Sequence, residues 1–381
     1  MSKSSSLNNV VNVTSLDVPK LLSIFRKHGE VPGFLGAPGV GKTASIKQWA
    51  IDEAKRQSKT FVECPTVEDW DNPENFCYSV VLTSQIEEID SRGLPHVVTK
   101  DGGEQVTVYT LTELFPQKGT GVIVLDEFPN GRTQVQNAMQ PMILEHKAGS
   151  VLISPDIQFI VAGNRQSDNC GTHFVPSALR NRVFWYEVSK PSVTDWLDKM
   201  DEIGQPINPR MAAWMLSIGA KYYDNFDPRA EQYAYGTTRS VHKASEIIED
   251  QTDYKMIQKL VGGAIGEDAG IEFVAFLKLT ETVDINALLK DPKQIHTYED
   301  NLGLLYSISI TLIDKFVDTI GSNEPILDII METKRKEHGM FILRGTMNKL
   351  GKSKFIERLT KCKNAKDITN KYYQLLRGDE E

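Results

Sequence analysis

The sequence is poor in cysteine and has no long apolar run, and these two absences narrow what the protein can be. Its four cysteines form no Cys-x-x-Cys pair and have no histidine at zinc-ligand spacing, so we expect neither a disulfide scaffold nor a metal site built on them. No stretch of about 18 apolar residues occurs. The first twelve residues lack the basic-then-apolar pattern of a secretion signal. We therefore expect a cytoplasmic protein with no membrane segment.

Composition and charge describe a globular chain with an uneven surface. Hydrophobic residues make up 40% and charged residues 25% of the sequence, which is typical of folded proteins. The length of 381 residues fits two or three domains. Residues 331–381 hold 13 Lys and Arg against 7 Asp and Glu, a net charge of +6. Because the net charge of the whole chain is −8, the first 330 residues carry a net charge of −14. An acidic body is a poor footprint for duplex nucleic acid. The basic end is expected to be a solvated helical surface, and the alternative is contact with nucleic acid or an acidic partner, so nucleic acid is not excluded.

The first half of the chain alternates apolar runs with amphipathic stretches, the pattern of a parallel sheet covered by helices. It predicts an α/β fold with a five-stranded, mainly parallel sheet and hairpin inserts. The hairpins are predicted over His96–Thr110 and Leu144–Ser154. The five strands are predicted at Val31–Leu35, Ser79–Thr83, Val122–Leu125, Ile157–Ala162 and Val183–Val188.

After Pro191 the apolar residues follow a helical period and strand-like runs are absent from the sequence. We predict a nucleotide-binding core over residues 1–190, a helical lid over 191–291 and a basic helical extension over 292–381.

A glycine-rich segment directly after the first apolar run matches a phosphate-binding pattern in full. Gly36–Thr43 reads GAPGVGKT, which is G-x-x-x-x-G-K-[ST], and a predicted helix, Ala44–Lys55, follows it. Backbone N–H groups in such a loop surround phosphates, the lysine reaches the β- and γ-phosphates, and the threonine hydroxyl binds Mg²⁺. The predicted nucleotide contacts are Gly36, Pro38, Gly39, Val40, Gly41, Lys42, Thr43 and Ala44.

The third apolar run ends in two adjacent carboxylates, Asp126 and Glu127. In a P-loop protein that hydrolyses nucleotides, the first acid helps to hold Mg²⁺ and the second can orient the attacking water. Acids also end buried strands merely to meet solvent. The phosphate loop earlier in the chain favours the functional interpretation, because both motifs fall at the carboxyl ends of strands.

Polar residues near the last two strands are further candidates. Asn164 follows the fourth strand and could bond the γ-phosphate or the water, although a turn-forming role is an alternative. Arg180 and Arg182 precede the fifth strand. An arginine that reaches a phosphate bound by a neighbouring subunit would stabilise the transition state, and the alternative is a surface arginine.

These motifs together resemble those of the AAA+ ATPases, specifically the MoxR-like branch. The resemblance covers about Leu16 to Asp291. Besides the phosphate loop, it rests on the segments LDEFPNGRTQVQNAMQPMI, FIVAGNRQSD, VPSALRNRVFWYEV and GGAIGEDAGIEFVAFLKL.

The resemblance implies a role for each matching residue. Lys42 and Thr43 match Walker A, Asp126 and Glu127 match Walker B, and Asn164 matches sensor 1. Three arginines also match the pattern. Arg182 matches the arginine finger, with Arg180 as the alternative two positions away, and Arg239 matches sensor 2.

The resemblance also implies an activity, cofactors and partners. It implies an ATPase that binds ATP and Mg²⁺, forms a homo-oligomeric, hexameric ring and remodels a protein client. A protein with a von Willebrand A domain is the partner that the branch suggests. Two alternatives stay open: a nucleic-acid motor or restriction-type GTPase on the same core, and a nucleotide-gated scaffold with little turnover.

Overall fold

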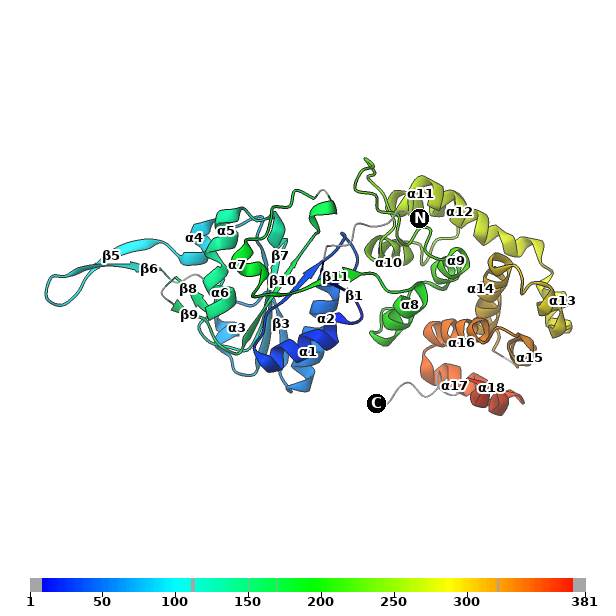
Figure 1. The fold of residues 1–381 in the computed structure, drawn as a ribbon. Helices are drawn as coiled ribbons and strands as arrows, with labels where there is room; N and C mark the ends of the chain where they lie inside the picture. Colours follow the sequence, from blue (N-terminus) through cyan, green and yellow to red (C-terminus); the bar gives the residue numbers. More distant parts are fainter. Residues whose placement is uncertain (1–8, 111–113, 150, 169, 321, 373–381) are drawn as a thin grey trace. The chain divides into compact units, whose positions relative to one another are not determined.

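The computed structural model describes residues 9–110, 114–149, 151–168, 170–320 and 322–372 (Figure 1). These residues form two compact units. One contains the chain up to Pro191 together with Asp227–Glu231, and the other contains Ser192–Phe226 together with the chain from Gln232 onward. The outer ends of the predicted core and of the predicted extension, residues 1–8 and 373–381, lie outside the described residues.

The first unit is built on a seven-stranded sheet in which every paired strand runs parallel to its neighbour. The predicted α/β class with a parallel sheet is confirmed, and each predicted strand is present. The order across the sheet is β1-β11-β2-β10-β7-β4-β3. The strands are β1 (Val11–Thr14), β2 (Pro32–Leu35), β3 (Thr60–Glu63), β4 (Asn75–Leu82), β7 (Gly121–Asp126), β10 (Ile157–Gly163) and β11 (Phe184–Ser189).

The prediction of five strands was wrong because both edge strands were missed. β1 reads VNVT and β3 reads TFVE, and all of these residues are exposed or half-buried. An edge strand has a neighbour on one side and is less covered by helices. Its sequence therefore lacks the continuous apolar run that marks a central parallel strand.

Helices cover both faces of this sheet, and β7 shows this residue by residue. Val122 and Val124 pack in one hydrophobic cluster with α1 (Val18–His28) and α2 (Lys42–Arg56). Ile123 and Leu125 pack in another, with residues of α5 (Thr133–Ala138) and α6 (Gln140–Glu145). Alternate side chains of a strand point to opposite faces. Both sets are buried, which explains the unbroken apolar sequence. The other helices of this unit are α3 (Val67–Asp71), α4 (Glu88–Arg92) and α7 (Ser177–Arg180).

The apolar period predicts one helix over Arg132–Glu145, with Pro141 either kinking it or shifting its start. The structure divides this segment between α5 and α6. Pro141 lies in the first turn of α6, where its missing N–H has no helical partner to lose.

Both predicted hairpins are present. β5 (Pro95–Thr99) pairs antiparallel with β6 (Gln105–Tyr109), and β8 (Lys147–Ala148) pairs with β9 (Val151–Leu152). Figure 1 shows the β5–β6 hairpin reaching away from the rest of its unit. Every residue of β5 is exposed, so this hairpin adds little to the core.

Every regular element of the second unit is a helix, and no strand occurs among its described residues. One hydrophobic cluster includes Tyr306 and Ile310, and a second includes Ile308 and Leu312. All four belong to α14, which therefore contributes to both clusters. The predicted division into 191–291 and 292–381 stays a prediction. The helices are α8 (Val193–Glu202), α9 (Pro209–Ile218), α10 (Thr238–Ile247), α11 (Tyr254–Ile265), α12 (Glu267–Lys278), α13 (Ile285–Lys290), α14 (Leu302–Asp318), α15 (Glu324–Glu332), α16 (Lys336–Leu350), α17 (Lys352–Thr360) and α18 (Ala365–Lys371).

Among the helices that the structure describes, none has both the length and the apolar character needed to cross a bilayer.

Candidate functional site

The glycine-rich segment forms the turn between β2 and α2. Gly36 begins the turn, and a Cβ there would lie 2.4 Å from the Val188 carbonyl oxygen of β11. Gly41 precedes α2 with φ +98°, a conformation that glycine adopts without strain. The two glycines therefore fit a tight strand–loop–helix turn. The other predicted contacts, Pro38, Gly39, Val40 and Ala44, lie in this turn or in the first turn of α2.

Lys42, the first residue of α2, is buried and its ammonium is surrounded by oxygen. Its Nζ donates to the carbonyl of Gly36 at 2.6 Å, to the carbonyl of Ala37 at 3.0 Å and to Asn164 Oδ1 at 3.3 Å. A buried cation needs such partners. The lysine is thereby held at the inner side of the loop, where phosphate oxygens can take the place of the carbonyls.

Thr43 and Asp126 meet at the carboxyl edge of the sheet. Thr43 Oγ1 donates to Asp126 Oδ2 at 2.9 Å, which joins the start of α2 to the end of β7. A hydroxyl and a carboxylate side by side are hard oxygen ligands. Mg²⁺ is usually bound by one or two such groups together with phosphates and waters. These two residues fit a magnesium ion held mainly by a nucleotide.

Glu127 follows directly and has a constrained backbone. Its φ of +52° lies in the left-handed region, which is uncommon for a residue other than glycine. Its N–H donates to Asp126 Oδ1 at 2.8 Å, and its carboxylate accepts a hydrogen bond from the Ser84 hydroxyl. The turn therefore directs the Glu127 carboxylate toward Ser84, just beyond the end of β4.

Asn164 stands at the end of β10, which lies between β2 and β7 in the sheet. The strand order thus puts its amide between the phosphate loop and the acidic pair. This explains why Lys42 and Asn164 are in hydrogen-bond contact although 122 positions separate them.

The residue after Asn164 was not predicted, yet it anchors this corner. Arg165 Nη1 donates to Glu187 Oε1 at 2.6 Å, and Nη2 donates to Asp168 Oδ1 at 2.8 Å. The two carboxylates are 4% and 2% exposed. Burial disfavours the charged guanidinium, but the two carboxylates outweigh this effect and raise the pKa of Arg165. The sequence feature that could have indicated a buried cation is Glu187, an acid inside the predicted strand Val183–Val188.

Ser84 was also missed. The feature that could have indicated it is its position just after a predicted strand, the same position that singled out Asn164.

Tyr78 of β4 is buried near Asp126, and its hydroxyl has no hydrogen-bond partner among the described residues. Burial raises the pKa of Tyr78, with the Asp126 carboxylate adding to the effect.

Arg180 and Arg182 are not brought to this cradle. Arg180 ends α7, Arg182 precedes β11, and both are exposed. The register pairs Phe184 with Pro32, at the amino ends of β11 and β2, whereas the phosphate loop follows the carboxyl end of β2. The two arginines therefore lie toward the amino ends of the parallel strands, whereas the cradle of their own chain lies at the carboxyl ends.

Arg239 belongs to the second unit, in the first turn of α10, and is exposed. Thr237 caps this helix through its side chain. The role of Arg239 toward a nucleotide stays a prediction.

Comparisons with known proteins give structural neighbours alone. No family model matches the sequence, and no curated protein matches it. NtrX from Brucella abortus, solved in complex with ADP, is 14% identical, with 96% of this chain and 69% of that chain covered and a TM-score of 0.34. A RuvB variant from Thermotoga maritima is 16% identical, with 78% and 80% covered and a TM-score of 0.33. The ORC2 protein of Aeropyrum pernix is 9% identical, with 90% and 89% covered and a TM-score of 0.37.

Similarities of this size do not assign the chain to a family. The chemistry of the site follows from its own residues.

Proposed function

We propose that this protein is an ATPase that binds Mg²⁺-ATP in the Gly36–Thr43 loop and cleaves its γ-phosphate. One observation carries the proposal: Lys42, Thr43, Asp126, Glu127 and Asn164 come from three separated segments and meet at one edge of the sheet. A glycine-rich turn with no ligand would have no need of a buried lysine, an acid pair and an amide around it.

The roles follow from the contacts. Lys42 would exchange its carbonyl partners for β- and γ-phosphate oxygens, while Asn164 holds the γ-phosphate or the attacking water. Thr43 and Asp126 would hold Mg²⁺, which when bound neutralises charge on the phosphates. Glu127 would accept a hydrogen bond from the water and orient it for in-line attack.

The finer proposal is an AAA+ ring ATPase of the MoxR-like branch, which acts on a protein client, such as a von Willebrand A domain protein. The position of the arginines supports an oligomer. Arg182, or Arg180, is exposed toward the opposite sheet edge, so either could serve the cradle of a second copy. Arg239 on the helical unit would sense the nucleotide from the predicted lid.

Nucleotide binding and phosphate release by matched variants test the proposal. In Lys42→Ala, binding of a fluorescent ATP analogue should be lost. Glu127→Gln should bind it normally but release phosphate about 10²- to 10⁴-fold more slowly, the range of a general base. Lys55→Ala is the control, because Lys55 is exposed on the same helix.

Removal of Mg²⁺ with a chelator should stop phosphate release by the unmodified chain. The proposal is wrong if the unmodified chain binds no nucleoside triphosphate with magnesium present, or if Lys42→Ala hydrolyses ATP as fast as Lys55→Ala.

A further inference from the structure

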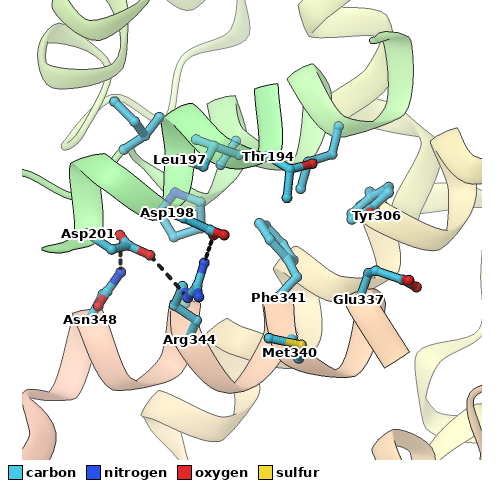
Figure 2. A pocket seen from close by; sticks show the side chains of 15 residues that line it. Thr194, Leu197, Asp198, Asp201, Tyr306, Glu337, Met340, Phe341, Arg344 and Asn348 are labelled. Atoms are coloured by element: carbon cyan, nitrogen blue, oxygen red, sulfur yellow. Dashed lines mark hydrogen bonds and ion pairs between the residues drawn. The ribbon is translucent and has the colours of Figure 1, made fainter. Parts of the chain in front are cut away.

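The helical unit contains a cavity of about 280 Å³ that the proposed ATPase does not use. Figure 2 shows it between α8 and α9 on one side and α16 on the other, with Tyr306 of α14 at one end. Most of its wall is apolar. The apolar wall residues include Leu197, Ile207, Leu216, Met340 and Phe341.

One end of the cavity is closed by an ion cluster whose cation is already neutralised. Arg344 is paired with Asp198, and its Nε lies 3.3 Å from Asp201 Oδ2. Asn348 donates to the other oxygen of Asp201 at 2.9 Å. With two carboxylates around it, Arg344 has little attraction left for an anionic ligand.

The other end holds polar groups without partners. Tyr306 is 8% exposed, and among the described residues its hydroxyl has no hydrogen-bond partner. Burial, with the Glu337 carboxylate adding to it, raises the pKa of Tyr306, so the hydroxyl is a donor at neutral pH. Glu337 is exposed at the rim and makes no hydrogen bond or ion pair within the described part of the chain. Figure 2 labels Glu337, Tyr306 and Phe341, which all line the cavity.

These walls select a ligand with an apolar body and a positive charge. Three carboxylates and one guanidinium line the cavity, so its net charge favours a cation. The volume lies just below the usual range for small-molecule pockets, about 300–1,000 Å³, and suits one or two large side chains. Interfaces are commonly anchored by such side chains inserted into pockets.

We propose that this cavity is a docking site for a peptide segment of a partner protein in which a large apolar side chain lies beside a lysine or arginine. The apolar side chain would fill the space lined by Leu197 and Phe341. The cation would pair with Glu337 at the rim. The Tyr306 hydroxyl would donate to a carbonyl of the bound segment.

A set of three labelled peptides tests this on the full chain without nucleotide, so the result does not depend on the cradle. The probe is fluorescein-labelled Gly-Ser-Phe-Leu-Lys-Gly-Ser amide, measured by fluorescence anisotropy. One matched peptide has Glu in place of Lys, and the other has Ala-Ala in place of Phe-Leu. We expect the first peptide to bind about tenfold or more tightly than either of the others, because it alone satisfies both the apolar wall and the acidic rim.

Conservative variants locate the binding. Glu337→Gln should weaken the lysine peptide about fivefold and leave the glutamate peptide no weaker. Tyr306→Phe, which keeps the ring, should weaken it about threefold. Asp300→Asn is the control, because Asp300 is an exposed acid of the same unit outside the cavity.

The proposal is overturned if the three peptides bind equally. It is also overturned if Glu337→Gln leaves the affinity for the lysine peptide within twofold of the control.

Discussion

The chemistry of the cradle depends on which oxygen each single side chain contacts. Lys42 is satisfied by two carbonyls and an amide oxygen, and Thr43 by a carboxylate. On nucleotide binding, we expect phosphate oxygens and a metal ion to take the place of these contacts. The Glu127 carboxylate, in contrast, accepts a hydrogen bond from Ser84, a group that a nucleotide does not replace.

We expect Ser84→Ala to raise the basal rate of phosphate release. The Ser84 hydroxyl competes with water for the Glu127 carboxylate, and a hydrogen bond of about 1 kcal/mol corresponds to about a fivefold change in rate. Steady-state phosphate release at saturating ATP measures the effect. Ser84→Thr keeps a hydroxyl and is the matched control. A rate in Ser84→Ala below that of the control would mean that Ser84 positions Glu127 for catalysis instead.

At the scale of secondary-structure elements, the end of β10 is tied to β11 by ions. Arg165 follows β10, Glu187 lies within β11, and Asp168 ends the short 3-10 turn that comes directly after Arg165. Because both carboxylates are buried and the Arg165 side chain is 14% exposed, we expect the cluster to hold Asn164, one residue away, in position.

Arg165→Ala should therefore destabilise the first unit strongly. Removing one partner of a buried ion cluster costs about 3–5 kcal/mol, whereas an exposed pair contributes about 0–1 kcal/mol. Arg132→Ala is the control, since Arg132 and Glu87 form a pair that is 72% and 65% exposed. Urea unfolding gives both free energies. Equal losses in the two variants would contradict a buried, stabilising cluster.

His338 on α16 makes the helical unit sensitive to acid. It is 1% exposed and contacts the Leu305 carbonyl and the Ser309 hydroxyl on α14. Burial lowers the pKa of His338 from 6.5 to about 4, against the opposing effect of its bond to Leu305. Because the unfolded chain takes up the proton first, we expect the contribution of His338 to stability to fall as pH drops from about 6.5 toward about 4 and to stay constant above that window.

His338→Gln should remove most of this acid sensitivity. The histidine accounts for a loss of about 3 kcal/mol across the window, which urea unfolding at pH 7.5 and pH 4.5 measures. His28→Gln, on the first unit and exposed, should keep the acid sensitivity of the unmodified chain. If His338→Gln loses as much stability in acid as His28→Gln does, His338 is not the responsible group.

At the scale of the whole molecule, the parallel sheet separates the groups that the proposed reaction needs. The cradle lies at the carboxyl edge, and Arg180 and Arg182 lie toward the amino edge. Since one chain cannot easily bring both to the same phosphate, hydrolysis is expected to require contact between copies.

Mixing two inactive variants tests this dependence. Arg182→Ala should bind ATP yet hydrolyse it about 10³- to 10⁵-fold more slowly, as for loss of an arginine finger. Lys42→Ala has an intact arginine but no functional loop. Mixing the two should restore part of the phosphate release, because an intact cradle can then meet an intact arginine.

If Arg182→Ala alone keeps the unmodified rate and Arg180→Ala loses it, the finger is Arg180. A chain that stays monomeric and fully active excludes both.

The sequence by itself determined the central strands, the helical character after Pro191 and the local turn at Gly36–Thr43. Each of these follows from near neighbours: continuous apolar runs, a helical period, and glycines at fixed spacing before Lys42. The edge strands β1 and β3 were not predictable in this way, because their exposed and half-buried residues form no continuous apolar run.

Tertiary structure decided which distant residues share a site. The strand order put Asn164 beside Lys42 and Ser84 beside Glu127, and it brought Arg165 into contact with Asp168 and Glu187. It also created the cavity between α8, α9 and α16, whose lining comes from segments more than a hundred residues apart. Sequence patterns report local periodicity, whereas these contacts depend on the order in which strands and helices pack.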